Sequence, residues 1–307
     1  MKRMILMIIL ALLLAGSAGA EKPLRVVCTL TDLAWLAEQV GGQDAEVVAL
    51  CPGEYDPHFL PAKPSFARRL GKADLLCYSG LELEVGWLPV LMDKARNRKL
   101  HPGGLGELDC SQALERVLDI PTGGISRAQG DVHPEGNPHY LLNPHNGVLV
   151  MRLMAERMAV LRPKAADGFR DRAEVAVVDL QKRIKAWEKR SASLRGQPVV
   201  QYHQQWEYLA DWLGLKILGD VEHRPGIAPS PRHVSKLATQ ARKANVELLL
   251  AAPWNHLDAA GKAAGRMSAR LVVLPPAVGA LSGVSGYGEM FDRIIEDLLL
   301  GKGGNDG

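Results

Sequence analysis

The sequence predicts an α/β protein with two parallel-sheet lobes that are joined by a long spine helix. Short β-rich runs alternate with helical runs in both halves of the chain, an order typical of parallel sheets covered by helices on both faces. Between the halves, one amphipathic pattern covers residues 166–194. As a helix it would be about 43 Å long at 1.5 Å per residue, more than one small lobe needs.

The first part of the mature chain, residues 21–163, predicts the N-terminal lobe. Its β-rich runs are LRVVCTL, EVVALC and ADLLCYS, and its helical runs are TDLAWLAEQVGG, PSFARRLG, LEVGWLPVLMDKARN and NGVLVMRLMAERMAVLRP. Thr31 and Asn146 are the expected N-caps of the first and last of these helices. Gly41-Gly42 and Pro163 are the expected stops, because glycine and proline interrupt helical hydrogen bonding.

Residues 164–196 are expected to form the linking helix. Its apolar side chains recur mostly at steps of three and four, which places them on one face; they are Phe169, Ala173, Val177, Leu180, Ile184, Trp187 and Leu194. The C-terminal lobe, residues 197–301, follows with the β-rich runs PVVQY, LKILG, VELLLAA and LVVLPP. Its helices are QQWEYLADWLG, SPRHVSKLATQARKA and GYGEMFDRIIEDLLLG, the second with Ser230 as N-cap and Pro231 at the first helical position. Residues 302–307 are expected to be a disordered tail.

The first twenty residues are typical of a secretory signal peptide. Lys2 and Arg3 precede an apolar run that is shorter than the roughly 20 residues of a membrane span, and Ala18-Gly19-Ala20 offers a cleavage site. We therefore expect an exported, periplasmic protein of about 287 residues, enough for two domains. Removing Lys2 and Arg3 takes the formal charge from +3 to +1. A nearly neutral chain argues against a nucleic-acid partner or an anionic membrane surface.

The exported chain contains four cysteines, none of which forms a CxxC pair; they are Cys28, Cys51, Cys77 and Cys110. Three of them lie in or at the end of β-rich runs, which favours small buried side chains. One or two disulfides are the alternative, and their pairing stays open.

Histidines are the strongest candidates for chemistry. Zinc binds His, Cys or carboxylate ligands, usually four, but no HExxH, HxH or paired CxxC motif occurs here. Ligands would therefore come from distant loops, and in open α/β sheets these meet beyond the carboxyl ends of the strands. His203 directly follows one β-rich run, His58 comes a few residues after another, and His139 lies in the connection out of the first lobe.

Two of these histidines share a local form, Asp56-Pro57-His58 and Asn137-Pro138-His139. Proline restricts the backbone, and the Asp or Asn side chain bonds locally, so each imidazole is pre-organised for a metal. The other histidines are expected at surface or turn positions: His101, His145, His223 and His233. His133 is either an exposed loop residue or part of the lip of the site.

Five segments in order carry a resemblance to a known family: DPHFLPAKPS, KADLLCYSGLELEVGWL, GDVHPEGNPHYLLNP, YHQQWEYLADWLGL and RPGIAPSPRHVSKL. They resemble the zinc/manganese solute-binding proteins of ABC importers, the cluster A-I type, over nearly all of residues 21–300. The resemblance implies a monomer that binds a divalent metal ion in the cleft between its lobes and delivers it to a membrane permease. It implies His58, His139 and His203 as the metal ligands.

The chain departs from that family at several positions. The usual fourth ligand, a carboxylate after the last strand, is missing, because LPPAVGALSGVSGYG contains no acid before Glu289. The fourth ligand position would then be filled by water, by His256 or by another residue. Asn143 stands where the family commonly has an Asp that orients an imidazole, and a His-rich loop is absent.

Three imidazoles favour Zn²⁺, with Mn²⁺ as the alternative, because manganese prefers oxygen-rich sites. We therefore expect a zinc-binding protein and not an enzyme. Two other functions stay open. A zinc hydrolase with three His ligands would need a general base, and the only candidates are Glu54 and His133. An adhesin-like or zinc-buffering protein of the same fold would hold the metal for structure.

Overall fold

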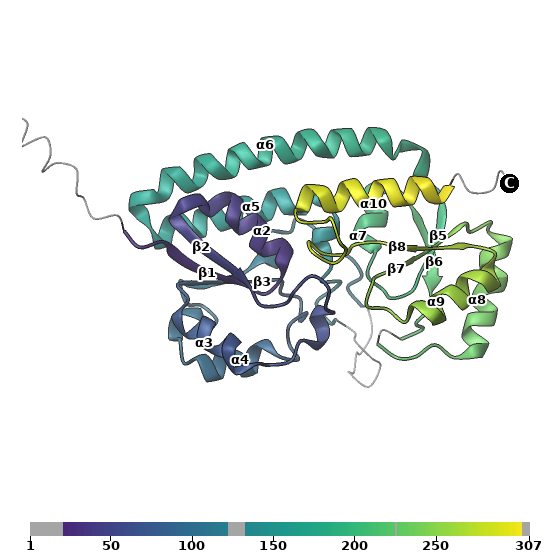
Figure 1. Cartoon of the computed structure of the whole chain (residues 1–307), viewed down its shortest axis with the longest axis horizontal. Coiled ribbons are helices and arrows are strands. Elements are labelled where there is room, and N and C mark those ends of the chain that lie inside the picture. Colours follow the sequence, from purple (N-terminus) through teal and green to yellow (C-terminus); the bar gives the residue numbers. More distant parts are fainter. Residues whose placement is uncertain (1–20, 122–132, 225, 303–307) are drawn as a thin grey trace, which may run out of the picture.

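The computed structural model describes residues 21–121, 133–224 and 226–302, and it has the predicted two lobes (Figure 1). The N-terminal lobe contains a parallel sheet in the order β2-β1-β3-β4. The C-terminal lobe repeats this topology in the order β6-β5-β7-β8. The strands are β1 (Leu24–Cys28), β2 (Ala45–Ala49), β3 (Leu75–Tyr78), β4 (Glu107–Asp109), β5 (Pro198–Gln201), β6 (Lys216–Asp220), β7 (Leu248–Ala251) and β8 (Arg270–Val273).

Helices cover both sheets. In the N-terminal lobe they are α2 (Thr31–Gly41), α3 (Pro64–Lys72), α4 (Leu88–Ala95) and α5 (Pro144–Leu161). In the C-terminal lobe they are α7 (Glu207–Leu213), α8 (Pro231–Lys243), α9 (Leu257–Met267) and α10 (Tyr287–Lys302). The spine is α6 (Ala166–Arg190), which runs along both lobes (Figure 1). Among the described residues, no helix is both long and apolar enough to cross a membrane.

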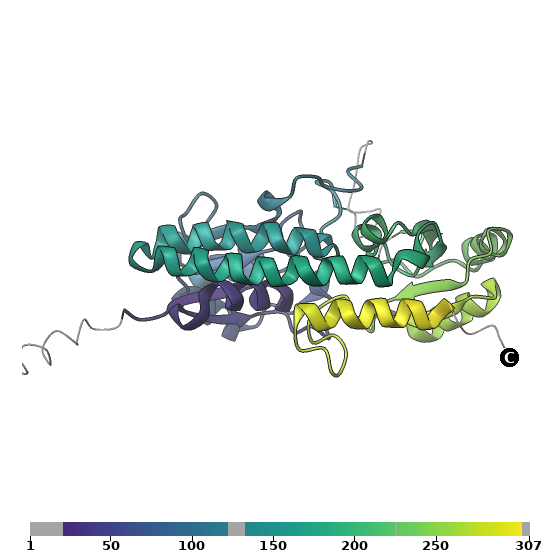
Figure 2. The same ribbon diagram turned by 90° about the horizontal axis from the view of Figure 1, so that it is seen from above.

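The spine helix buries one face along its length. All the apolar side chains expected there are buried, whereas Val175 and Val178 on the opposite face are 73% and 63% exposed. The helix packs beside α5 in the first lobe and beside α10 in the second (Figure 2). The prediction that it continues to Leu194 is wrong. The Ser191 hydroxyl bonds back to the carbonyl of Trp187, and a 3-10 turn over Ala192–Leu194 follows, which still buries Leu194.

Two predicted N-caps are also wrong. Thr31 is the first residue inside α2 and its hydroxyl bonds to the opposite lobe, as described below. Helix α5 begins at Pro144, three residues earlier than predicted, because Asn143 and not Asn146 caps it by accepting a hydrogen bond from the backbone of His145 at 3.0 Å. By contrast, Ser230 caps α8 with Pro231 at the first helical position, as predicted.

Other boundaries differ from the sequence prediction. Helix α4 starts at Leu88 and not at Leu83. Strand β4 and helix α9 were not predicted, since β4 has only three residues and the buried face of α9 is mostly alanine. The predicted signal peptide and residues 303–307 of the tail lie outside the described residues, and Lys302 belongs to α10.

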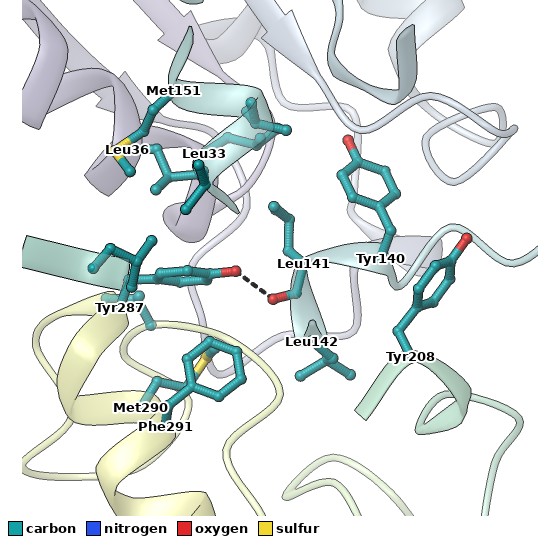
Figure 3. Packing of buried hydrophobic residues seen from close by; sticks show 14 of the residues in the cluster. Leu33, Leu36, Tyr140, Leu141, Leu142, Met151, Tyr208, Tyr287, Met290 and Phe291 are labelled. Carbon is teal, nitrogen blue, oxygen red and sulfur yellow. Dashed lines mark hydrogen bonds between the residues drawn. The ribbon is translucent and has the colours of Figure 1, made fainter. Parts of the chain in front are cut away.

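One hydrophobic cluster runs through both lobes and the spine. Figure 3 shows its centre, where Leu33, Leu36 and Met151 of the first lobe face Tyr287 and Phe291 of α10. The four cysteines are free, buried thiols, with Cys28, Cys77 and Cys110 inside this cluster. They therefore pack as small apolar side chains, and no disulfide joins them.

Candidate metal centre

His58 lies in a short turn after β2. The turn Pro57–Phe59 is capped by Asp56, whose Oδ1 accepts a hydrogen bond from the backbone N–H of His58 at 3.0 Å. The same oxygen lies 2.7 Å from His58 Nδ1. Although burial alone would raise the pKa of Asp56, its hydrogen bonds with His58 hold that pKa below the ordinary value. An ionised Asp56 therefore fixes the ring, and Nε2 is the ring nitrogen that would coordinate a metal ion.

His139 is held by the same kind of local turn. Asn137 Oδ1 accepts from the backbone N–H of His139 at 2.9 Å, and the Asn137 amide donates to Glu207 of the second lobe at 3.0 Å. The prediction that Asp56 and Asn137 bond locally is thus confirmed. Asn143 and His145 form a third copy of this turn, so Asn143 caps a helix and orients no ligand. His145 is exposed and pairs with Glu188; the turn alone therefore does not mark a ligand.

His203 follows β5 at its carboxyl end, as predicted. Its Nδ1 lies 2.9 Å from Oε2 of Glu222, which itself follows the neighbouring strand β6. The same carboxylate oxygen accepts from the backbone N–H of Gly226 at 3.0 Å. Sequence reasoning missed Glu222, although its place directly after a strand next to β5 was the available signal.

The fold brings His58, His139 and His203 together. Each offers one ligand atom, and these atoms all lie within 4.8 Å of one another. A tetrahedral zinc ion with Zn–N bonds of about 2.05 Å has about 3.3 Å between its ligand nitrogens. The separations between these nitrogens would therefore have to shorten by up to about 1.5 Å to give zinc geometry.

The His139 ring is well suited to bind a cation. Burial, and then the nearby rings of His58, His203 and His133, lower the pKa of His139 well below the ordinary value. Its Nε2 is buried and has no hydrogen-bond partner among the described residues. A neutral ring with a buried lone pair is what coordination requires.

His133 lies at the lip of the site, one of its two expected positions. Its Nε2 is 3.2 Å from Nε2 of His58, and the ring centroids are 5.3 Å apart. It is not a member of the three-residue group whose ligand atoms are mutually close.

The remaining histidines lie elsewhere. His256 is exposed at the N-cap of α9 and is also outside the group. His101, His145 and His223 are exposed, as expected. His233 contacts His223 and the carbonyl of Asp220.

A small cavity of about 40 Å³ adjoins His139. Its walls include Asp32 of the first lobe and Gln205, Trp254 and Ala277 of the second. Gln205 is buried, and its Oε1 has no hydrogen-bond partner among the described residues. Neither Asp32 nor Gln205 was predicted, because nothing local distinguishes them from other polar residues near helix starts.

A known protein-family model matches most of the chain. The family model described as zinc-uptake complex component A, periplasmic (ZnuA), matches residues 26–299.

Individual curated proteins match only part of the chain, at low sequence identity. The manganese-binding lipoprotein MntA of Bacillus subtilis is 27% identical over 207 residues, which cover 66% of this chain and 63% of MntA. The zinc-binding lipoprotein AdcA of Streptococcus pneumoniae is 23% identical over 229 residues, which cover 73% of this chain and 44% of AdcA. The matches thus span less than two thirds of these relatives.

Solved structures share the fold. A zinc-bound deletion mutant of ZnuA superposes with a TM-score of 0.75 at 19% identity, covering 90% of this chain and 97% of that one. A manganese-bound periplasmic metal-binding protein from Candidatus Liberibacter asiaticus gives 0.73 at 17% identity, covering 90% and 98%. At such identities the likeness establishes the two-lobed architecture alone.

Proposed function

The chain belongs to the family of the periplasmic component A of zinc-uptake complexes, and from this premise we propose that it captures Zn²⁺ outside the cytoplasm. His58, His139 and His203 bind the ion between the lobes, and the loaded protein delivers it to the permease of an ABC importer. The observation that carries this proposal is the convergence of three histidines from three separate loops.

The donor set favours zinc over manganese. Three imidazole nitrogens suit Zn²⁺, whereas Mn²⁺ prefers oxygen ligands. Carboxylates back two of the rings, since Asp56 and Glu222 bond to Nδ1 of His58 and His203. This arrangement raises the basicity of an imidazole ligand and fixes its tautomer. The relatives' names include both zinc and manganese, so the preference is a property to measure.

The fourth position is best filled by water. The cavity beside His139 has volume for at least one water molecule. Gln205 Oε1 is a buried acceptor there, and a metal-bound water would donate a hydrogen bond to it. We therefore assign Gln205 as the residue that holds this water in place of the missing carboxylate.

The same cavity favours binding over hydrolysis. Substrate pockets commonly have volumes of about 300–1,000 Å³, whereas this cavity has about 40 Å³. Glu54, one of the two candidate bases, is exposed. The site is built to enclose an ion and its water.

The decisive experiment is metal content by mass spectrometry after dialysis of the stripped protein against equal Zn²⁺ and Mn²⁺. His139→Ala is the test variant. His145→Ala is the matched control, because it sits in the same kind of Asn-Pro-His turn but is exposed. We expect one zinc per chain in the parent and the control, and none in His139→Ala. Retention by His139→Ala, or manganese in place of zinc, would refute the assignment.

A further inference from the structure

The loop that follows β8 is held by the opposite lobe. The backbone N–H of Val278 donates to Asp32 Oδ1 at 2.7 Å, and the carbonyl of Val278 accepts from the Thr31 hydroxyl at 2.7 Å. Thr31 and Asp32 are the first two residues of α2. Two consecutive side chains of the first lobe thus bond both polar backbone groups of one residue in the second.

Packing leaves little freedom at this contact. A Cβ atom at Gly53 would lie 2.0 Å from the carbonyl oxygen of Val278, so only glycine permits the observed approach. Nearby, the Tyr287 hydroxyl donates to the carbonyl of Leu141 and forms another bond between the lobes (Figure 3). The loop therefore closes against the first lobe through specific contacts.

Asp32 brings a buried carboxyl group to this contact. Asp32 is 3% exposed. Burial raises the pKa of its carboxyl group to about 7, although the hydrogen bond from the backbone of Val278 acts to lower it. No basic side chain forms an ion pair with Asp32 among the described residues. A buried carboxylate without a cation is costly. Asp32 lines the same cavity as His139, so a metal ion in the three-histidine centre would supply the missing positive charge.

We propose that Asp32 and Thr31 form a metal-linked latch between the lobes. The divalent ion attracts the Asp32 carboxylate across the cavity, so metal binding tightens its hold on Val278 and keeps residues 276–284 closed against the first lobe. Both are positioning residues, since neither belongs to the group of ligand atoms. This inference rests on the proposed function and names the regulation of that same site.

Reciprocity gives the latch a measurable consequence. If metal strengthens the contact between Asp32 and Val278, the contact strengthens metal binding by the same factor. Loss of the latch should therefore release zinc faster, although all three histidines remain. It should also open the loop even when zinc is bound.

The test compares Asp32→Asn and Thr31→Val with the parent protein. Asp32→Asn keeps an oxygen that can accept from Val278 but removes the charge, and Thr31→Val removes only the hydroxyl. Ser285→Ala is the matched control, because it removes a hydroxyl of the same loop that bonds within its own lobe, to Glu289. Zinc affinity and release are measured by chelator competition, and loop closure by hydrogen–deuterium exchange of residues 276–284.

In the parent and in Ser285→Ala, zinc should slow exchange across the loop. Asp32→Asn should lose most of this protection and about tenfold in zinc affinity, a usual coupling between sites. Thr31→Val should lose less zinc affinity and less loop protection than Asp32→Asn, but more than Ser285→Ala. The latch is wrong if zinc does not slow loop exchange in the parent, or if Asp32→Asn retains the parent's affinity and protection. A parent that binds no zinc at all would instead refute the proposed function.

Discussion

His58 and His133 face each other through their ring nitrogens, with 3.2 Å between the two Nε2 atoms. Asp56 occupies Nδ1 of His58, so His133 covers the nitrogen that a metal would use. At this separation the N–H of one ring donates a hydrogen bond to the nitrogen of the other. Metal binding has to displace this contact.

Replacing His133 with alanine should therefore speed zinc association and change the equilibrium affinity by less than about tenfold, since only the covering contact is lost. Stopped-flow fluorescence with a zinc chelator would measure the rate, with His101→Ala, an exposed histidine, as the control. A loss of affinity above about 100-fold would identify His133 as a fourth ligand.

Glu222 should tune the affinity of the site without binding the metal. Glu222→Gln keeps the shape of the side chain but removes the charge that backs His203, so zinc affinity should fall by about 10- to 100-fold. Competition with a chelator of known affinity would measure it. Glu289→Gln, at a carboxylate that bonds only to Ser285 among the described contacts, is the control and should change nothing. Equal affinity in both variants would show that Glu222 does not orient the ligand.

Zinc affinity should decline in acid, because a protonated imidazole cannot coordinate. The ordinary imidazole pKa is about 6.5, and the pKa of His139 is lowered below it by burial and the neighbouring rings. The His139 ring thus stays neutral further into acid than an ordinary imidazole. Affinity measured from pH 5 to 8 should drop below about pH 6.5. A flat profile would contradict a three-histidine site.

Glu84 should make the metal-free protein less stable as the pH rises. Burial raises its pKa to about 7 despite hydrogen bonds from Thr29, Ser79 and Gly80. The folded state then binds the proton more tightly than the unfolded chain, whose glutamate titrates near pH 4.3. Stability from this group is therefore present below about pH 4.3 and is lost as the pH rises through about 7.

Glu84→Gln removes this titration. Its free energy of unfolding, relative to the parent, should improve by about 1–3 kcal/mol between pH 5 and 8. Urea denaturation in the presence of a chelator would measure the difference. A relative change in the opposite direction would show that Glu84 is stabilised as an anion.

The buried face of the spine should dominate its contribution to stability. Ile184 is 1% exposed, and Ile184→Ala should cost about 2–5 kcal/mol because it leaves a cavity in the hydrophobic cluster beneath the spine. Val178→Ala on the solvent face should stay within about 0.5 kcal/mol. Similar losses in both variants would mean that the helix does not bury a single face.

The sequence was informative at the two local turns that hold His58 and His139. The Asp56-Pro57-His58 and Asn137-Pro138-His139 turns depend on hydrogen bonds that span two residues, and the structure contains both. The apolar face of the spine follows from helical periodicity alone. Where a tertiary contact competed with a local one, the prediction was wrong: the Thr31 hydroxyl bonds to Val278, 247 positions away, and does not cap α2.

By itself, then, the sequence determined the alternation of strands and helices, the spine and the pre-organised imidazoles. Only the tertiary structure decided which of three equivalent Asx-Pro-His turns point into one site, and that Glu222, Gln205 and Asp32 surround it. The physical reason is that local hydrogen bonds depend on neighbours in the chain. The convergence of loops depends instead on strand register and on the packing of two lobes, which bring together groups up to about 250 residues apart.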